Sequence, residues 1–466
     1  MTAHPRDITA AGPSARPMDA RTQRLLHGPI LPTLLAMAAP NLVVMIAQAA
    51  TGLIETWFIA KLGTDALAGM ALVFPGVMLT QMISGGAMGG GISSAIARAL
   101  GAGRRDDADA LVLHALFING AIGLFFTVTM LSFGRDIYRL LGGSGAELDA
   151  ALAYSNVIFA GNILLWLTNG LASVIRGTGN MLVPAMVTGL GVIVLVPLSP
   201  ALIFGFGPIP AFGVAGGGLA FTLYYVGAVI ALGWYVLSGR NPARFRWTRL
   251  RWPMLKNILS VGAVASITSL QTNVIIALTT ALAASTAGAA AAAGYGTGAR
   301  LEYLLVPLAF GLGAPLVAMV GINIGAGQKE RALRIAYIGG AITFLATELV
   351  GLTAAIWPHA WMSQFSSDPH VIETGATYLR IVGPAFGFFG LAMGLYFASQ
   401  GAGRLLWPLA AGFFRLGIAI IGGWAALYLT GSLTWLFVAI AIGFVVHGLS
   451  LLTAIRLGAW FKRHTA

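Results

Sequence analysis

The residue of this sequence best suited to carry a proton is a glutamate inside a long apolar segment. Glu55 lies in the stretch 31–60, and Asn41 and Gln48 precede it at intervals of seven residues. Side chains seven residues apart lie on one face of a helix, so these three form a polar stripe. Burial away from water disfavours the ionised carboxyl group, which lets it exchange protons near neutral pH. We therefore predict that Glu55 is a proton-coupling residue and that Asn41 and Gln48 line a substrate or ion cavity. The alternative is a carboxylate near the outer interface, paired with Lys61.

Polar residues also occur in later apolar segments. Asn162 and Asn169 are seven residues apart in one of them, and Gln271 and Asn273 lie together in another. We predict that these four side chains line the same cavity as the stripe that ends at Glu55. The alternative is a set of hydrogen bonds that hold neighbouring helices together.

Two further acids fall within apolar segments, where a charge is costly and is a functional hypothesis by default. Glu302, two residues after Arg300, is predicted to bind a cationic substrate or a proton. The alternative is an ion pair or hydrogen bond that fixes its helix. Glu348 has leucines around it at helical intervals, so we expect a structural role or a place at the lipid interface.

Three basic residues lie in the apolar segments of the second half of the chain. Arg380 and Arg415 are expected to neutralise acids or bond carbonyl groups there rather than contact a substrate. His447 is alone in its segment and is interpreted as a packing residue, with a proton relay as the alternative.

Several other kinds of chemistry lack the residues that they need. The chain has no cysteine, which excludes thiol catalysis and cysteine-based metal sites. It also lacks the Gly-x-x-x-x-Gly-Lys-Ser/Thr motif of ATP-binding loops. The acids Asp106, Asp107 and Asp109 lie close together beside Arg104 and Arg105, in a pattern typical of a solvated helix start. We therefore predict no enzyme activity, no metal and no cofactor.

The composition indicates an integral membrane protein. Of the 466 residues 58% are hydrophobic and 9% are charged, and the mean hydropathy is +0.84. Soluble domains carry about 25% charged residues. We expect no cleavable signal peptide, because the first apolar run exceeds the roughly 7–15 residues of a signal core. A net charge of +12 in such a chain predicts basic loops rather than binding to nucleic acid.

The apolar segments are long enough to position these residues in a membrane. A spanning helix needs about 20 apolar residues. We predict twelve spans, at residues 31–60, 66–100, 111–134, 151–175, 181–204, 213–237, 254–283, 290–324, 332–357, 371–399, 405–429 and 433–457.

The basic residues predict the orientation. About 21 of them fall in the termini and the even-numbered loops, whereas 3, namely Lys61, Arg135 and Arg139, fall in the odd-numbered loops. Basic loops stay in the cytoplasm. We therefore predict a multi-pass protein of the inner (plasma) membrane with both termini cytoplasmic.

The sequence contains an internal repeat. Five pairs of landmarks are separated by the same 224 residues: Pro29 and Pro253, Gly101 and Gly325, Tyr154 and Tyr378, Arg176 and Gln400, and Pro184 and Pro408. A constant separation indicates a duplication, and six spans per copy make the copies parallel. We predict a cytoplasmic tail (1–28), a first six-helix lobe (29–238), a cytoplasmic linker (239–253), a second six-helix lobe (254–458) and a second cytoplasmic tail (459–466).

Three segments resemble the multidrug and toxic compound extrusion (MATE) family of secondary transporters. They are the stretch from Gly52 to Gly63 around Glu55, the stretch from Arg300 to Gly327, and the stretch from Tyr378 to Gly403. The resemblance covers about Pro29 to Gly458. It implies an all-α membrane fold of twelve transmembrane helices in two parallel six-helix lobes around a central cavity. It also implies export of cationic or amphipathic small molecules by alternating access, driven by H⁺ or Na⁺, and we expect a monomer in the lipid bilayer.

The sequence departs from the family pattern at positions that bear on the coupling ion. Many relatives carry Asn and Asp before a proline of the fifth helix, where this chain has Leu195 and Ser199. Sodium-linked relatives carry acids in the seventh and tenth helices, where this chain has Gln271 and the region around Phe389. These departures favour protons. Glu55 corresponds through the repeat to Thr279, so the predicted coupling acid belongs to the first lobe alone.

Other functions stay open at this point. A Na⁺-coupled exporter is one alternative, and a flippase for lipid-linked precursors is another, although a flippase is expected to have a more cationic cavity and often extra spans. A membrane enzyme would need paired acids for metal-bound diphosphate. A channel would need a ring of charge around its pore.

Overall fold

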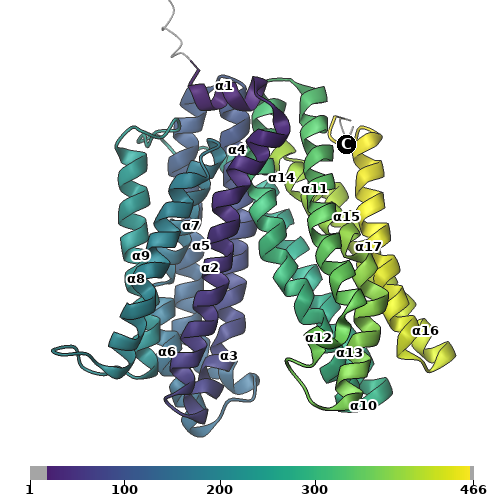
Figure 1. The fold of residues 1–466 in the computed structure, drawn as a ribbon. Helices are drawn as coiled ribbons and strands as arrows, with labels where there is room; N and C mark the ends of the chain where they lie inside the picture. The colour runs from purple at the N-terminus through teal and green to yellow at the C-terminus, as the bar shows by residue number, and fades with distance from the viewer. Residues whose placement is uncertain (1–17, 462–466) are drawn as a thin grey trace, which may run out of the picture.

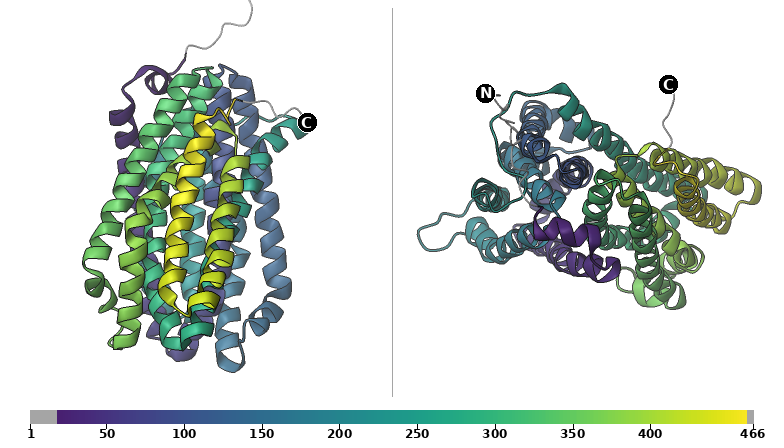
Figure 2. Two further views of the ribbon diagram at one scale, coloured as in Figure 1. Left: turned by 90° about the vertical axis from the view of Figure 1, so that its right-hand side faces the viewer. Right: turned by 90° about the horizontal axis from the view of Figure 1, so that it is seen from above.

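The structure is a computed structural model that describes residues 18–461, and within that range it is built from helices (Figure 1). The described part holds one isolated β-bridge, between Phe206 and Ile209, in a loop. The long helices run alongside one another in two groups that differ in sequence position, as Figure 1 and the view from above in Figure 2 show.

The N-terminal lobe consists of the first group of helices. Its short leading helix carries an N-cap, because the Asp19 side chain accepts a hydrogen bond from the backbone of Thr22. The elements are α1 (Ala20–His27), α2 (Ile30–Ala60), α3 (Thr64–Gln81), the π-helix η1 (Met82–Met88), α4 (Gly89–Gly101), α5 (Arg105–Leu140), α6 (Gly145–Ala160), α7 (Asn162–Gly177), α8 (Leu182–Phe204) and α9 (Val214–Leu237).

The C-terminal lobe follows after a stretch without helix. Its elements are α10 (Trp252–Gly325), α11 (Lys329–Ile356), α12 (Pro358–Met362), α13 (Pro369–Val382), the 3₁₀-helix η2 (Gly383–Ala385), α14 (Phe386–Ala402), α15 (Leu406–Gly417), the π-helix η3 (Ile418–Gly422), α16 (Gly423–Thr430) and α17 (Leu433–Arg456).

The helices account for the twelve predicted spans. Ten stretches of the described chain are long and apolar enough to cross a membrane, and the bent pair α6–α7, with an angle of 45°, adds an eleventh. The α10 stretch is two helices that meet at Gly288, whose φ of 78° is not helical. We expected a longer break between residues 283 and 290. The alanine-rich sequence there continues the helix instead, because alanine has the highest helix propensity.

Glycines that correspond through the repeat let the two lobes approach each other. A Cβ atom on Gly101 of α4 would overlap the backbone of Ile322 in α10, and one on Gly325 would overlap the backbone of Arg98 in α4. Arg98 and Ile322 are also 224 residues apart. The two crossings are therefore equivalent under the repeat, which is the arrangement expected of two parallel copies related by an axis along the membrane normal.

The lobes pack closely at the end of the molecule where α1 and the C-terminal end of the described chain lie (Figure 1). A single hydrophobic cluster there contains Leu25 of α1, Ala97 of α4, Val320 of α10, Ala398 of α14 and Trp460. Toward the opposite end α2 and α10 diverge in the view of Figure 1. We call the closely packed end the terminal end.

Candidate functional site

Glu55 is a buried acid with a single hydrogen bond. The residue belongs to α2 and is 2% exposed. The Ser199 hydroxyl of α8 donates a hydrogen bond to its Oε2 atom at 2.9 Å. The Oε1 atom is buried and has no hydrogen-bond partner among the described residues. No ion pair within residues 18–461 involves Glu55. Such an acid is costly to keep ionised.

A run of glycines brings α9 against this acid. A Cβ atom on Gly217 would overlap Oε1 of Glu55, and it would lie 3.4 Å from the ring of Tyr154 in α6. The neighbouring Gly216 and Gly218 approach the backbones of Leu202 and Tyr154 in the same way. Small residues let membrane helices pack at short distance. We call Glu55, Tyr154, Ser199 and Gly217 the N-lobe acid site.

The rest of the α2 stripe faces the same neighbouring helices. The Asn41 amide is 3% exposed and contacts Sδ of Met181, just before α8, at 3.9 Å. Gln48 interacts with Tyr224 of α9. Lys61 does not pair with Glu55, because its ammonium group lies 3.6 Å from the ring centroid of Trp57.

The second buried acid has a counter-ion. Glu302 lies in the second half of α10, is 4% exposed, and faces Arg415 of α15 with 3.7 Å between Oε2 and Nη2. The Tyr378 hydroxyl of α13 donates a hydrogen bond to its Oε1 atom. The predicted neighbour, Arg300, points elsewhere and lies 5.7 Å from the ring of Phe365. The sequence predicts that Arg415 neutralises an acid. It does not show that this acid is Glu302, because that depends on how α15 packs against α10.

Aromatic side chains enclose the pair of Glu302 and Arg415. The guanidinium group of Arg415 lies 4.4 Å from the ring centroid of Phe444. The rings of Tyr295 and Tyr378 are 5.2 Å apart and meet edge to face. His447 is buried beside Arg415, and its Nδ1 atom has no hydrogen-bond partner in the described structure. We call Glu302, Tyr378 and Arg415 the C-lobe acid site.

The repeat relates the tyrosines of the two acid sites but not the acids. Tyr154 and Tyr378 occupy equivalent positions, and each lies beside the buried acid of its lobe. The acids come from different helices, because the position equivalent to Glu55 is Thr279. Thr279 donates a hydrogen bond to the Ile275 carbonyl of its own helix at 2.6 Å.

The four predicted cavity amides are dispersed over the molecule. Asn162 donates to the Gly123 carbonyl of α5 at 3.2 Å, and Asn169 donates to the Ser84 hydroxyl of η1 at 2.8 Å. Gln271 is 7% exposed and its amide nitrogen lies 3.5 Å from the Leu409 carbonyl. Asn273 is exposed and donates to the Ser269 carbonyl of its own helix at 3.0 Å. The amides of Asn162, Asn169 and Gln271 thus connect neighbouring helices. None of the four amides has a described hydrogen bond to Glu55.

The remaining intramembrane charges have local partners. Glu348 accepts a hydrogen bond at 2.6 Å from the Gly387 backbone, near the start of α14, where helical N–H groups need partners. Arg380 lies 3.0 Å from Glu373 in an exposed pair. No three His, Cys, Asp or Glu residues in the described range gather as metal ligands would.

A small cavity of about 10 Å³, enough for about one water molecule, lies between the lobes beside an arginine. Its lining includes Gly86 and Arg176 from the N-terminal lobe and Phe310, Phe397 and Gln400 from the C-terminal lobe. The Arg176 guanidinium carbon lies 5.9 Å from the ring centroid of Phe310, and its buried Nε has no hydrogen-bond partner in the described chain. None of the ion pairs found within residues 18–461 includes Arg176.

Several members of these sites were not predicted from the sequence. In the sequence Arg176, Tyr154 and Tyr378 stand out only as landmarks of the repeat. The sequence signal that could have identified them is the repeat itself, because Tyr154 and Tyr378, and likewise Arg176 and Gln400, are 224 residues apart. Ser199 was treated as a departure from a pattern, although its hydroxyl is the hydrogen-bond donor to Glu55.

Comparison with known sequences identifies the family of the chain. The MatE family model matches twice, at residues 40–201 and 265–425. An FAD transporter of Shewanella oneidensis is 29% identical over 376 residues, which cover 79% of this chain and 82% of the relative. A probable multidrug resistance protein NorM of Thermotoga maritima is 26% identical, with 82% of each chain covered.

Solved structures show the same fold. A MOP superfamily transporter from Pyrococcus furiosus superimposes with a TM-score of 0.86 at 23% identity, covering 96% of this chain and 100% of that chain. An outward-facing conformation of a multidrug resistance MATE family transporter gives a TM-score of 0.87, also at 23% identity and with the same coverage. The two six-helix lobes predicted from the repeat are thus confirmed.

Proposed function

Because this chain belongs to the MATE family of membrane transporters, we propose that it is a secondary-active exporter of small molecules that works as an H⁺ antiporter by alternating access. The observation that carries the proposal is Glu55, a buried carboxyl group that has one hydrogen bond and no counter-ion among residues 18–461. Protonation removes the cost of a buried charge. The ion biases the two states of the transporter to the extent that Glu55 binds the proton with different affinity in each.

Contacts within the C-lobe acid site favour H⁺ over Na⁺. A bound Na⁺ would need several oxygen ligands free of other cations, whereas the Glu302 carboxylate already faces the guanidinium group of Arg415. In the N-lobe acid site the side-chain oxygens are those of Glu55, Ser199 and Tyr154, and among the described residues only the Ser199 hydroxyl is hydrogen-bonded to the Glu55 carboxylate. A proton needs only one carboxyl oxygen, and Oε1 of Glu55 is free.

The orientation follows from the distribution of charge. We place both termini in the cytoplasm of an inner (plasma) membrane, because the loops at the terminal end carry most of the basic residues. The closely packed terminal end then faces the cytoplasm, so the structure corresponds to a state closed to the cytoplasm. In this scheme Glu55 takes up a proton from outside, its helix repacks, the substrate leaves, and the proton is released to the cytoplasm.

Separate ion gradients test the coupling. The purified chain is placed in proteoliposomes, and export is measured with a pH gradient alone and with a Na⁺ gradient alone. The pH gradient is expected to drive export and the Na⁺ gradient to have no effect. Export that requires Na⁺ and ignores the pH gradient would contradict the proposal. The sidedness is checked by labelling single cysteines introduced at Arg244 and Ile209, which are expected to react from opposite sides.

For the substrate, cationic or amphipathic compounds are the first candidates, and a flavin nucleotide is the second. The second is favoured by Arg176, a guanidinium group without an ion pair in the described chain that lies over Phe310 between the lobes. A planar ring with phosphate groups matches the chemistry of both side chains. The cavity of about 10 Å³ between them must widen before it admits such a ligand. The Shewanella oneidensis relative, named an FAD transporter, supports the same choice.

Binding measurements distinguish the two classes of substrate. Equilibrium binding of FAD and of ethidium, a planar cation, is compared for the wild type and Arg176→Gln. If the substrate is a flavin nucleotide, FAD binds to the wild type and weakens about tenfold in the variant, as expected for the loss of a charged contact. Binding of ethidium but not FAD by the wild type would select the cationic class.

A further inference from the structure

A second cavity lies at the terminal end, outside the acid sites and the space between the lobes around Arg176. Its volume is about 480 Å³, within the range of small-molecule sites. Both lobes line it. Ala95, Ala99 and Ala102 come from the N-terminal side of the junction, and Asn257 and Gly325 come from α10.

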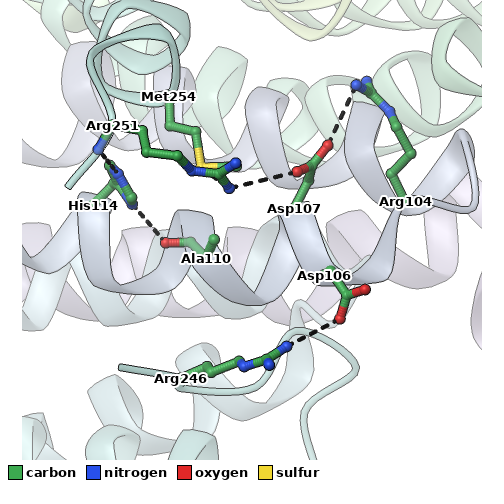
Figure 3. A network of polar contacts seen from close by, with 8 residues as sticks. All are labelled: Arg104, Asp106, Asp107, Ala110, His114, Arg246, Arg251 and Met254. Atoms are coloured by element: carbon green, nitrogen blue, oxygen red, sulfur yellow. Dashed lines mark hydrogen bonds and ion pairs between the residues drawn. The ribbon is translucent and has the colours of Figure 1, made fainter. Parts of the chain in front are cut away.

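Three arginines and one acid make the lining positively charged. Arg98, Arg104 and Arg251 face the cavity together with Asp107. Arg104 and Arg251 approach the same carboxylate from two sides, at 3.4 Å and 3.7 Å, as Figure 3 shows. Arg404 and Arg104 repel Arg98 electrostatically. One carboxylate therefore faces three guanidinium groups, which leaves an excess positive charge.

The guanidinium groups of Arg104 and Arg251 are available to a further anion. Their side chains are 64% and 54% exposed, so each keeps donors that Asp107 does not use. Exposed ion pairs contribute little to stability, and both distances exceed those of good charged hydrogen bonds. An anion with several oxygens can share these donors at little cost to the existing pairs. Phosphate presents such oxygens and matches the guanidinium fork.

Arg98 connects this cavity to the junction of the lobes. From α4 it donates to Oδ1 of Asn257 in α10 at 2.7 Å and to the Gly401 carbonyl of α14 at 3.1 Å. The Arg251 backbone is also anchored, because its N–H group donates to Nε2 of His114 in α5 at 2.8 Å (Figure 3). A ligand in the cavity thus touches the N-terminal lobe, the linker and α10, which must separate when the terminal end opens.

We propose that this cavity binds a phosphate group, supplied by an anionic lipid headgroup or by a soluble phosphorylated compound, and that its occupation holds the terminal end closed. The site is independent of the proton and substrate sites. A phosphate ligand stabilises the closed state to the extent that it binds more tightly when the terminal end is closed than when it is open.

Binding to the purified full chain in a maltoside detergent, which contains no phosphate, tests the site. Inorganic phosphate is measured by equilibrium dialysis, and dioleoyl phosphatidylglycerol is measured by native mass spectrometry against dioleoylglycerol, which lacks the phosphate. The test variant is Arg104→Gln/Arg251→Gln. Arg246→Gln is the matched control, because Arg246 belongs to the same linker but pairs at 3.2 Å with Asp106, away from the cavity (Figure 3).

The outcomes separate the sources of the phosphate. We expect the double variant to weaken binding at least about tenfold and the control to leave it within about twofold. Binding of phosphatidylglycerol alone assigns a lipid headgroup, and binding of both ligands assigns any phosphate group. The proposal is overturned if neither ligand binds to the wild type, or if the double variant binds as tightly as the control.

A distance measurement tests the effect on the lobes. The chain has no cysteine, so spin labels are placed by Phe206→Cys and Ser367→Cys, two exposed positions at the end opposite the terminal end. The ligand found above is expected to increase the population with the longer distance between labels, and the double variant to lose this response. An unchanged or shorter distance on saturation would refute the role in closure, whatever the result of the transport assays.

Discussion

The two lobes each bury one glutamate, but they treat it in opposite ways. Glu302 has a counter-ion, Arg415, and a hydrogen bond from Tyr378. Within the described part of the chain, Glu55 has one hydrogen bond, from Ser199, and a buried oxygen without a partner. Both residues are at most 4% exposed. The two acids are therefore buried to a similar extent and differ in how many groups offset the negative charge.

This difference indicates which acid can change its charge during a cycle. Neutralising Glu302 would leave Arg415 buried without a partner, and breaking such a pair costs about 3–5 kcal/mol. Neutralising Glu55 leaves no opposite charge behind and relieves an uncompensated one. We therefore interpret the C-lobe acid site as a fixed structural element and the N-lobe acid site as the one that exchanges protons.

Removal of the counter-ion is expected to have the largest effect on stability. Arg415→Met should lower the free energy of unfolding by about 3–5 kcal/mol, because it leaves the Glu302 carboxylate buried and unpaired. Adding Glu302→Gln should recover most of the loss. Thermal unfolding in detergent measures both. A single variant as stable as the wild type would mean that the pair of Glu302 and Arg415 does not hold the lobe.

The equivalent tyrosines offer a matched pair of variants. Tyr378→Phe removes a hydrogen bond to a carboxylate and should cost about 1.5–3 kcal/mol of unfolding free energy. Tyr154→Phe should cost much less, because Glu55 receives its described hydrogen bond from Ser199. Thermal unfolding of the two variants side by side provides the measurement. Equal losses would show that the two tyrosines support their acids alike.

Packing against Glu55 gives a smaller effect that sharpens the comparison. Gly217→Ala places a methyl group onto Oε1 of Glu55, and overpacking of this kind costs about 1–3 kcal/mol. The control is Gly227→Ala in the same helix, since a Cβ atom there meets nothing within 4 Å. We expect slower proton-driven export from the first variant only. Normal export from Gly217→Ala would show that the position of Oε1 does not matter.

The fold was predictable because its signals are long and repetitive. Twelve apolar segments and landmarks such as Tyr154 and Tyr378 predict two parallel lobes without any knowledge of side-chain contacts. The break in α10 was predicted at the right place but too long, since a single glycine, Gly288, interrupts an alanine-rich helix with no polar loop to mark it.

The site was only partly predictable. The charge of Glu55 inside an apolar helix is visible in the sequence, and so is that of Glu302. Their partners are distant in the chain, at Ser199 and Arg415, and depend on how the helices rotate against one another. Hydrogen-bonding amides such as Asn162 have the same sequence pattern whether they line a cavity or connect helices, so their roles could not be separated.

The most direct test of the account compares Glu55→Gln with Glu302→Gln in proteoliposomes under an imposed pH gradient. Glutamine resembles the protonated carboxyl group, so Glu55→Gln should fold, reach the membrane and bind substrate but lose gradient-driven export. Glu302→Gln should retain more export once rates are corrected for the amount of folded protein. Full proton-driven export by Glu55→Gln at normal expression would contradict the account and leave Glu302 as the coupling acid.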